Sequence, residues 1–160
     1  MNSENIRYKT VIEALENNTE IIIPLLKEVP EENLKRRPLP GKWSAHEHFC
    51  HLAEVHSLFF RRLDLMLTLD NPVIKPYNPD KDDEEDALLK IDLNEALTRF
   101  AGDRKKLVEK LKNLSVEQWE RTAQHPEYTL YSVYILFRHA ALHDMLHAYR
   151  IEELRYKKDW

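Results

Sequence analysis

Apolar side chains recur at steps of three and four along four long segments of this sequence, a spacing typical of amphipathic helices. The segments cover about residues 4–28, 45–69, 92–111 and 129–155. The first contains Pro24, which we expect to bend the helix or to end it early. No segment shows the apolar–polar alternation of a half-buried strand, so the pattern predicts an all-α protein.

Short polar patterns mark where several of these helices begin. Ser44 and Glu47 have the spacing of a capping box, in which each side chain accepts a hydrogen bond from the other residue's backbone N–H. Asp92 and Glu95 repeat that spacing at the third segment, and residues 115–118 repeat it again. The last pattern predicts a short extra helix before the fourth long one.

The stretch between the second and third long segments, residues 71–91, lacks helical periodicity. It contains three prolines, which favour extended or turned backbone, and an acidic run at residues 80–86 that is typical of a solvated loop. A loop of this length in a compact domain often carries function. We therefore expect an antiparallel four-helix bundle, formed as one domain over residues 1–160, with this long loop between helices two and three.

Composition supports a folded helical protein and excludes several classes of partner. Of 160 residues, 42% are apolar, 32% are charged and only two are glycine, fewer than the tight turns of a sheet protein require. The formal net charge of -4 offers no basic surface for a phosphate backbone, so we expect no nucleic-acid partner. The chain opens without a signal-peptide pattern, and no apolar run approaches about 18 residues. We therefore expect a cytoplasmic protein with no membrane partner.

The chain holds eight histidines, most of them in two groups on the second and fourth long helices. His143 and His147 are four residues apart and share one face of the last helix, so both rings can reach a common point. A third neutral imidazole from the second helix would complete a metal site with an open coordination position. Spacing alone does not separate this pair from His139 with His143, and it does not choose among the histidines at positions 46, 48, 51 and 56. The alternative is that all are ordinary surface or core histidines.

For four other side chains we expect a structural role. Cys50, the only cysteine, cannot form an internal disulfide or a cysteine-based zinc site, and we expect it to pack in the core. Trp43 is expected to pack the preceding connector onto the second helix, and Asp144 is expected at the surface. Arg104 lies on an apolar stripe and needs a polar partner if it is buried, but the pattern identifies none.

Several motifs occur in a characteristic order along the chain. They are Arg-Pro-x-Pro-Gly-Lys-Trp-Ser at residues 37–44, His-Leu-Ala-Glu at residues 51–54, and His143-Asp144-x-x-His147 followed by Ile151. Together they resemble the DinB/YfiT superfamily of bundle metalloproteins, over about residues 10–154. The loop at residues 70–77 and the segment at residues 125–127 resemble the YfiT branch in particular.

This resemblance implies a four-helix bundle, usually a homodimer, with one zinc or nickel ion held by one histidine of the second helix and two of the fourth. Carried over residue by residue, the metal ligands are His51, His143 and His147. Near the last ligand, many relatives carry further histidines or a glutamine where this chain has Leu146 and Arg150. The pocket around the metal and its substrate are therefore expected to differ from those relatives.

The resemblance also implies an activity. Members are described as metal-dependent hydrolases, and some branches are S-transferases or isomerases that use bacillithiol, mycothiol or glutathione. Our leading hypothesis is a metal-dependent S-transferase acting with a small thiol and a small electrophile, and the second is a hydrolase that uses metal-activated water. A metal-binding or stress-response protein without catalysis is the third. By the same analogy Lys75 and Tyr77 border the mouth of the pocket.

Overall fold

The computed structural model describes residues 3–79 and 84–158, so part of the predicted acidic loop, residues 80–83, lies outside the described residues. Four helices are long: α1 (Ser3–Glu28), α3 (Ala45–Thr68), α6 (Leu93–Lys112) and α8 (Val133–Arg155). Three further helices within the described residues are single turns: α2 (Glu31–Leu34), α5 (Ala87–Lys90) and α7 (Val116–Trp119). The predicted all-α fold, with a short extra helix before the last one, is confirmed. Across the described ranges, each helix is too short or too polar to cross a membrane.

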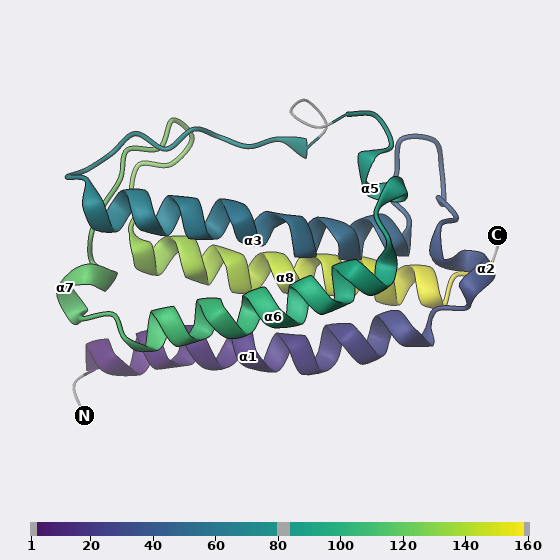
Figure 1. Cartoon of the computed structure of the whole chain (residues 1–160), viewed down its shortest axis with the longest axis horizontal. Helices are drawn as coiled ribbons and strands as arrows, with labels where there is room; N and C mark the ends of the chain where they lie inside the picture. The colour runs from purple at the N-terminus through teal and green to yellow at the C-terminus, as the bar shows by residue number, and fades with distance from the viewer. Residues whose placement is uncertain (1–2, 80–83, 159–160) are drawn as a thin grey trace.

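The four long helices pack side by side as a four-helix bundle (Figure 1). α1 and α3 each pack against both α6 and α8. α1 and α8 run in one direction, and α3 and α6 run in the other (Figure 1). The long connection between α3 and α6 runs back along the bundle, so α6 begins at the same end as α3 and runs in the same direction (Figure 1). As a result α3 lies antiparallel beside α8, and these two helices carry most of the histidines.

The helix ends follow the capping patterns closely. The backbone N–H of Glu47 donates to Oγ of Ser44 at 3.2 Å, and the backbone N–H of Ser44 donates to the Glu47 carboxylate at 2.8 Å. The other two predicted N-terminal caps also form. α1 continues through Pro24 instead of ending early. The last helix begins at Val133, later than predicted, because the Ser132 side chain caps it there.

Apolar side chains fill the bundle in two clusters that meet near its middle. The fully buried aromatic residues are Phe137 in the first cluster and Phe49 and Phe100 in the second. Between the clusters each long helix contributes one buried polar side chain. These are Asn18 of α1, His56 of α3, Arg104 of α6 and Asp144 of α8, with exposed fractions of 6%, 0%, 3% and 1%. We call these four residues the central polar layer.

Hydrogen bonds join all four members of the central polar layer. Arg104 donates to both carboxylate oxygens of Asp144, at 2.7 and 2.9 Å, and its Nε donates to Nε2 of His56 at 3.1 Å. Asn18 donates to the same carboxylate at 3.2 Å. The expectation that Asp144 lies at the surface is therefore wrong. Asp144 is the partner that Arg104 needed, and the pair is buried because it faces the other three helices.

The long connection after α3 is tied to the segment before α8. The backbone N–H of Ile74 donates to the carbonyl of Gln124 at 2.8 Å, and the backbone N–H of Gln124 donates to the carbonyl of Pro72 at 2.8 Å. Arg62 of α3 donates to the carbonyl of Lys75 at 3.0 Å. These contacts hold the connection along the outer side of α3 (Figure 1).

Candidate metal centre

Three histidine side chains from two helices meet between α3 and α8. His51 extends from α3 toward α8, where His143 and His147 lie one turn apart. Nε2 of His143 is 3.1 Å from Nε2 of His51 and 3.1 Å from Nε2 of His147. The structure thus brings together the three residues that the resemblance selects, and we call them the histidine cluster.

The geometry of the histidine cluster fits a divalent metal ion. A tetrahedral zinc ion with metal–nitrogen bonds of about 2.0–2.1 Å holds its ligand nitrogens about 3.3 Å apart. Two of the Nε2–Nε2 separations, at 3.1 Å, are close to that value, and the three ligand atoms all lie within 4.8 Å of one another. Three converging Nε2 atoms also leave a fourth tetrahedral position for a small molecule, as in catalytic zinc sites.

The other candidate histidines have different contacts. Nε2 of His46 lies 3.1 Å from the carbonyl of Leu88, and Nε2 of His56 accepts a hydrogen bond from Arg104. His139 packs against an aromatic ring of the preceding segment, outside the cluster. The structure therefore places none of these three residues among the converging nitrogens.

Two neighbouring side chains hold His147 in place. Nδ1 of His48 lies 2.8 Å from Nδ1 of His147, so one of the two rings donates a hydrogen bond to the other. The Trp43 ring stacks on His147 at a centroid distance of 5.8 Å and lies 4.9 Å from the ring of His51. A partner on the second ring nitrogen orients a metal-binding imidazole. Trp43 packs as expected, but the sequence pattern did not show that it packs against the candidate ligands.

Burial keeps the cluster uncharged near neutral pH. It lowers the pKa of His51 to about 3 and that of His147 to about 2, and it also lowers the pKa of His143. The Nδ1 atoms of His51 and His143 are buried without a hydrogen-bond partner among the described residues. Neutral imidazole is the form that binds metal, because its Nε2 then offers a lone pair.

A cavity of about 250 Å³ opens beside the histidine cluster and has His51 and His143 in its wall. We call it the apolar pocket because most of its other side chains are apolar or aromatic, among them Phe59, Tyr77, Tyr128 and Leu136. The Tyr77 ring lies nearly parallel to that of His51, at an interplanar angle of 8° and a centroid distance of 6.4 Å. Of the two residues expected at the mouth, Tyr77 lines the pocket and Lys75 does not.

A larger cavity of about 610 Å³ lies next to side chains that contact the cluster. Lys42, Arg150 and Lys157 line it together with one acidic residue, Glu153, so we call it the cationic pocket. Trp43 and His48, which contact His147, also line this pocket. Pro79 lines both pockets, so the two cavities adjoin at that residue.

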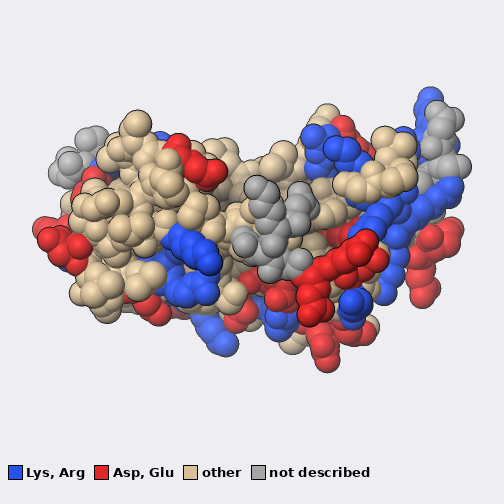
Figure 2. Space-filling model, turned by 90° about the horizontal axis from the view of Figure 1, so that it is seen from above, with Lys and Arg blue, Asp and Glu red and all other residues tan. Residues whose placement is uncertain are grey.

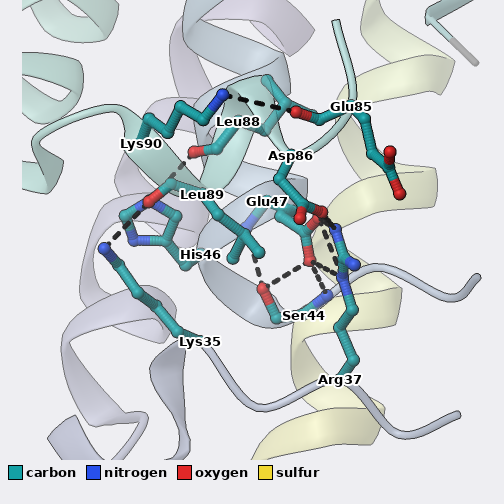
Figure 3. Close-up of polar contacts among 10 residues, drawn as sticks. All are labelled: Lys35, Arg37, Ser44, His46, Glu47, Glu85, Asp86, Leu88, Leu89 and Lys90. Atoms are coloured by element: carbon teal, nitrogen blue, oxygen red, sulfur yellow. Dashed lines mark hydrogen bonds and ion pairs between the residues drawn. The ribbon is translucent and has the colours of Figure 1, made fainter. Parts of the chain in front are cut away.

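A polar network fixes the start of α3, one turn before His51 (Figure 3). Arg37 donates from Nε to both oxygens of the buried Glu47 carboxylate, at 3.1 and 3.0 Å, and from Nη2 to Asp86 at 2.7 Å. Burial alone would raise the pKa of Glu47, but hydrogen bonds from Arg37 and Ser44 outweigh it and lower that pKa. The network therefore joins the connector before α3 to the end of the long loop, close to the cationic pocket.

Cys50 takes no part in the histidine cluster although it precedes His51 in the chain. Its side chain is buried in the second apolar cluster, and burial raises the pKa of its thiol to about 12. The expected core position is confirmed. Its thiol therefore stays protonated at neutral pH and is a poor nucleophile.

Comparison with known proteins gives matches over nearly the whole chain. The sequence profile of the DinB superfamily matches residues 14–151. A protein of Oceanobacillus iheyensis that is provisionally named a metal-dependent hydrolase is 30% identical over 159 residues, covering 98% of this chain and 90% of the relative. A relative with the same provisional name in Bacillus cereus strain B4264 is 28% identical over 152 residues, covering 94% of this chain and 87% of its own length.

Two solved structures share the fold. YfiT from Bacillus subtilis, described provisionally as a metal-dependent hydrolase with an unusual four-helix bundle topology, superposes with a TM-score of 0.85 at 21% identity. That match covers 100% of this chain and 91% of YfiT. A DinB-like protein of the same organism, YjoA, superposes with a TM-score of 0.59 at 16% identity, covering 91% and 89% of the two chains. At these identities the matches show the fold and confirm the four-helix bundle.

Proposed function

The chain belongs to the DinB superfamily, and from this premise we propose that it binds one divalent ion, zinc or nickel, through His51, His143 and His147. We further propose that it is an S-transferase, which joins a low-molecular-weight thiol such as bacillithiol to a small electrophile. The observation that carries both proposals is the convergence of three neutral imidazole nitrogens beside a cavity.

In the proposed reaction the thiol sulfur forms a bond to an electrophilic carbon, and the leaving group departs with its electron pair. The thiol proton passes to solvent. A bound divalent ion supplies positive charge that lowers the pKa of a nearby thiol, and the thiolate is the nucleophilic form.

The protein's own residues contribute position and exclusion of water. Trp43 and His48 hold the His147 ring, so the cluster is ordered before any substrate arrives. The apolar pocket offers Phe59, Tyr77 and Tyr128 as surfaces for an apolar electrophile. Binding the electrophile there brings its reacting carbon next to the cluster and displaces water from the apolar wall.

Metal content tests the proposed site directly. We expect purified protein to hold close to one equivalent of zinc or nickel by elemental analysis, and the His51→Ala and His143→Ala variants to lose most of it. His139→Ala is the matched control, because His139 lies one turn before His143 on the same helix but outside the cluster. Full occupancy in both ligand variants would rule out this site.

A fluorogenic electrophile tests the reaction. Metal-loaded protein is mixed with monochlorobimane and, in separate assays, with bacillithiol, glutathione, mycothiol or cysteine. We expect a rate that depends on one of these thiols and disappears in His143→Ala. A rate at the uncatalysed level with all four thiols would reject the transferase proposal.

Hydrolysis is the second candidate, because the relatives from Oceanobacillus and Bacillus cereus carry that provisional name. The same assay separates the two reactions when activated esters and amides replace monochlorobimane. Turnover of an ester that needs the three histidines but no added thiol would favour a hydrolase over a transferase.

A further inference from the structure

We propose that the cationic pocket binds the carboxylate-bearing end of the thiol substrate, so that its sulfur reaches the histidine cluster. This inference rests on the proposed S-transferase function and adds a substrate class to it. It would make the two neighbouring cavities the sites of the two substrates, with the thiol in the cationic pocket and the electrophile in the apolar pocket.

The charge of the cationic pocket is opposite to that of the whole chain. The protein has a formal net charge of -4, yet three basic side chains and one acidic side chain line this cavity. Arg150 forms an ion pair with Glu153 at 2.7 Å. Lys42 and Lys157 have no acidic partner within 4.0 Å in the described ranges. Two ammonium groups at one cavity, without an ion-pair partner among the described residues, favour an anionic ligand, and carboxylates are suitable acceptors for them.

The position of the pocket links it to the candidate metal centre. Its wall includes Trp43 and His48, and these two residues contact His147 directly. The pocket lies at the end of the bundle where α8 ends and α3 begins, and charged side chains gather toward this end in Figure 2. A ligand held by Lys42 and Lys157 therefore lies within one or two side chains of the cluster.

The size and chemistry of the pocket define the ligand class. A volume of about 610 Å³ is within the roughly 300–1,000 Å³ of typical small-molecule sites. The Trp43 ring, which lies 4.9 Å from the ring of His51, adds an apolar surface to the wall of this pocket. We infer a thiol with one or more carboxylates at the end remote from sulfur. Amine-only thiols such as cysteamine lack the group that the pocket recognises.

The test removes charge from the pocket without touching the cluster. In the double variant Lys42→Gln/Lys157→Gln, the KM for glutathione in the monochlorobimane assay is expected to rise about tenfold, with little change in kcat. The KM for cysteamine is expected to stay the same. Lys105→Gln/Lys106→Gln removes the same charge from two exposed positions of α6 and serves as the matched control. Equal glutathione KM values in the two double variants would overturn the proposal.

A binding measurement separates this inference from the proposed reaction. S-Methylglutathione keeps both carboxylates but cannot react, and its binding to metal-free protein is followed by tryptophan fluorescence. We expect its Kd to rise about tenfold in Lys42→Gln/Lys157→Gln and to remain unchanged in the control. Charge-dependent binding without any thiol-dependent turnover would reject the transferase and keep the anion site. Turnover with charge-independent binding would reject the anion site and keep the transferase.

Discussion

Replacement of Arg104 by methionine should be among the most destabilising single changes in this protein. The Arg104 side chain makes four hydrogen bonds within the bundle: two to Asp144, one to His56 and one to the carbonyl of Leu15. Methionine fills similar space but leaves the Asp144 carboxylate, which is 1% exposed, with Asn18 as its remaining side-chain partner. Removing one member of a buried ion pair costs about 3–5 kcal/mol, a large part of the roughly 5–15 kcal/mol that stabilises a typical domain.

Urea unfolding of metal-free protein gives the free energy of unfolding without a contribution from a bound ion. Arg104→Met/Asp144→Leu removes both charges and should be more stable than Arg104→Met, because no unpaired carboxylate is left in the core. Lys105→Met, at the exposed neighbouring position, is the control and should change stability by less than about 0.5 kcal/mol. A loss below about 1 kcal/mol in Arg104→Met would refute the view that this pair is a buried, mutually dependent unit.

Four further outcomes are expected. Glu47→Gln should lower the free energy of unfolding by about 2 kcal/mol in urea, because it loses the charged contact to Arg37 and weakens the helix cap. The pKa of Glu47 is lowered in the folded state, so the ionised side chain should contribute fully to the free energy of unfolding above about pH 5. This contribution should disappear as the pH falls through the folded-state pKa, and Glu47→Gln should lack this part of the pH dependence. Zinc or nickel should raise the melting temperature of the wild type but not of His143→Ala in differential scanning fluorimetry, and equal shifts would contradict the proposed ligand set. Cys50 should not react with Ellman's reagent until the protein unfolds, because burial raises its thiol pKa to about 12; rapid reaction of native protein would contradict this. Light scattering should give twice the chain mass of 19.1 kDa if α8 pairs with a second copy through its exposed apolar side chains, and a monomer at high concentration would exclude the homodimer.

Local patterns in the sequence predict the helices well, because caps and apolar spacing act within a few residues. Ser44 with Glu47 placed the start of α3 correctly, and the i, i+4 spacing of His143 and His147 placed both on one face of α8. Spacing did not select this pair, because His139 and His143 have the same spacing, and it did not identify the third member of the cluster. Four histidines on α3 offer similar spacing, and only the resemblance to a known family selected His51 among them.

Features that depend on how the helices pack could not be predicted. The central polar layer takes one residue from each of four helices, so its members look unrelated along the chain, and Asp144 was misplaced at the surface for this reason. The cationic pocket likewise combines Lys42, which precedes α3, with Lys157, which follows α8. For the central polar layer the sequence did hold a signal: an arginine on an apolar stripe needs a partner, and that partner must lie at the same level of a neighbouring helix. For the cationic pocket the sequence holds no comparable signal.

The separation of the clustered histidines along the chain determines when the site can exist during folding. His143 and His147 belong to one helix and can come together as soon as α8 forms, but His51 lies 92 residues before His143. Closing so long a stretch of chain is slow compared with forming a helix. A chain in which α8 has formed but α3 has not yet docked therefore holds only two of the three histidines. If the chain binds metal as proposed, docking of α3 against α8 is the step that completes the ligand set, so the metal would be selected by nearly folded protein.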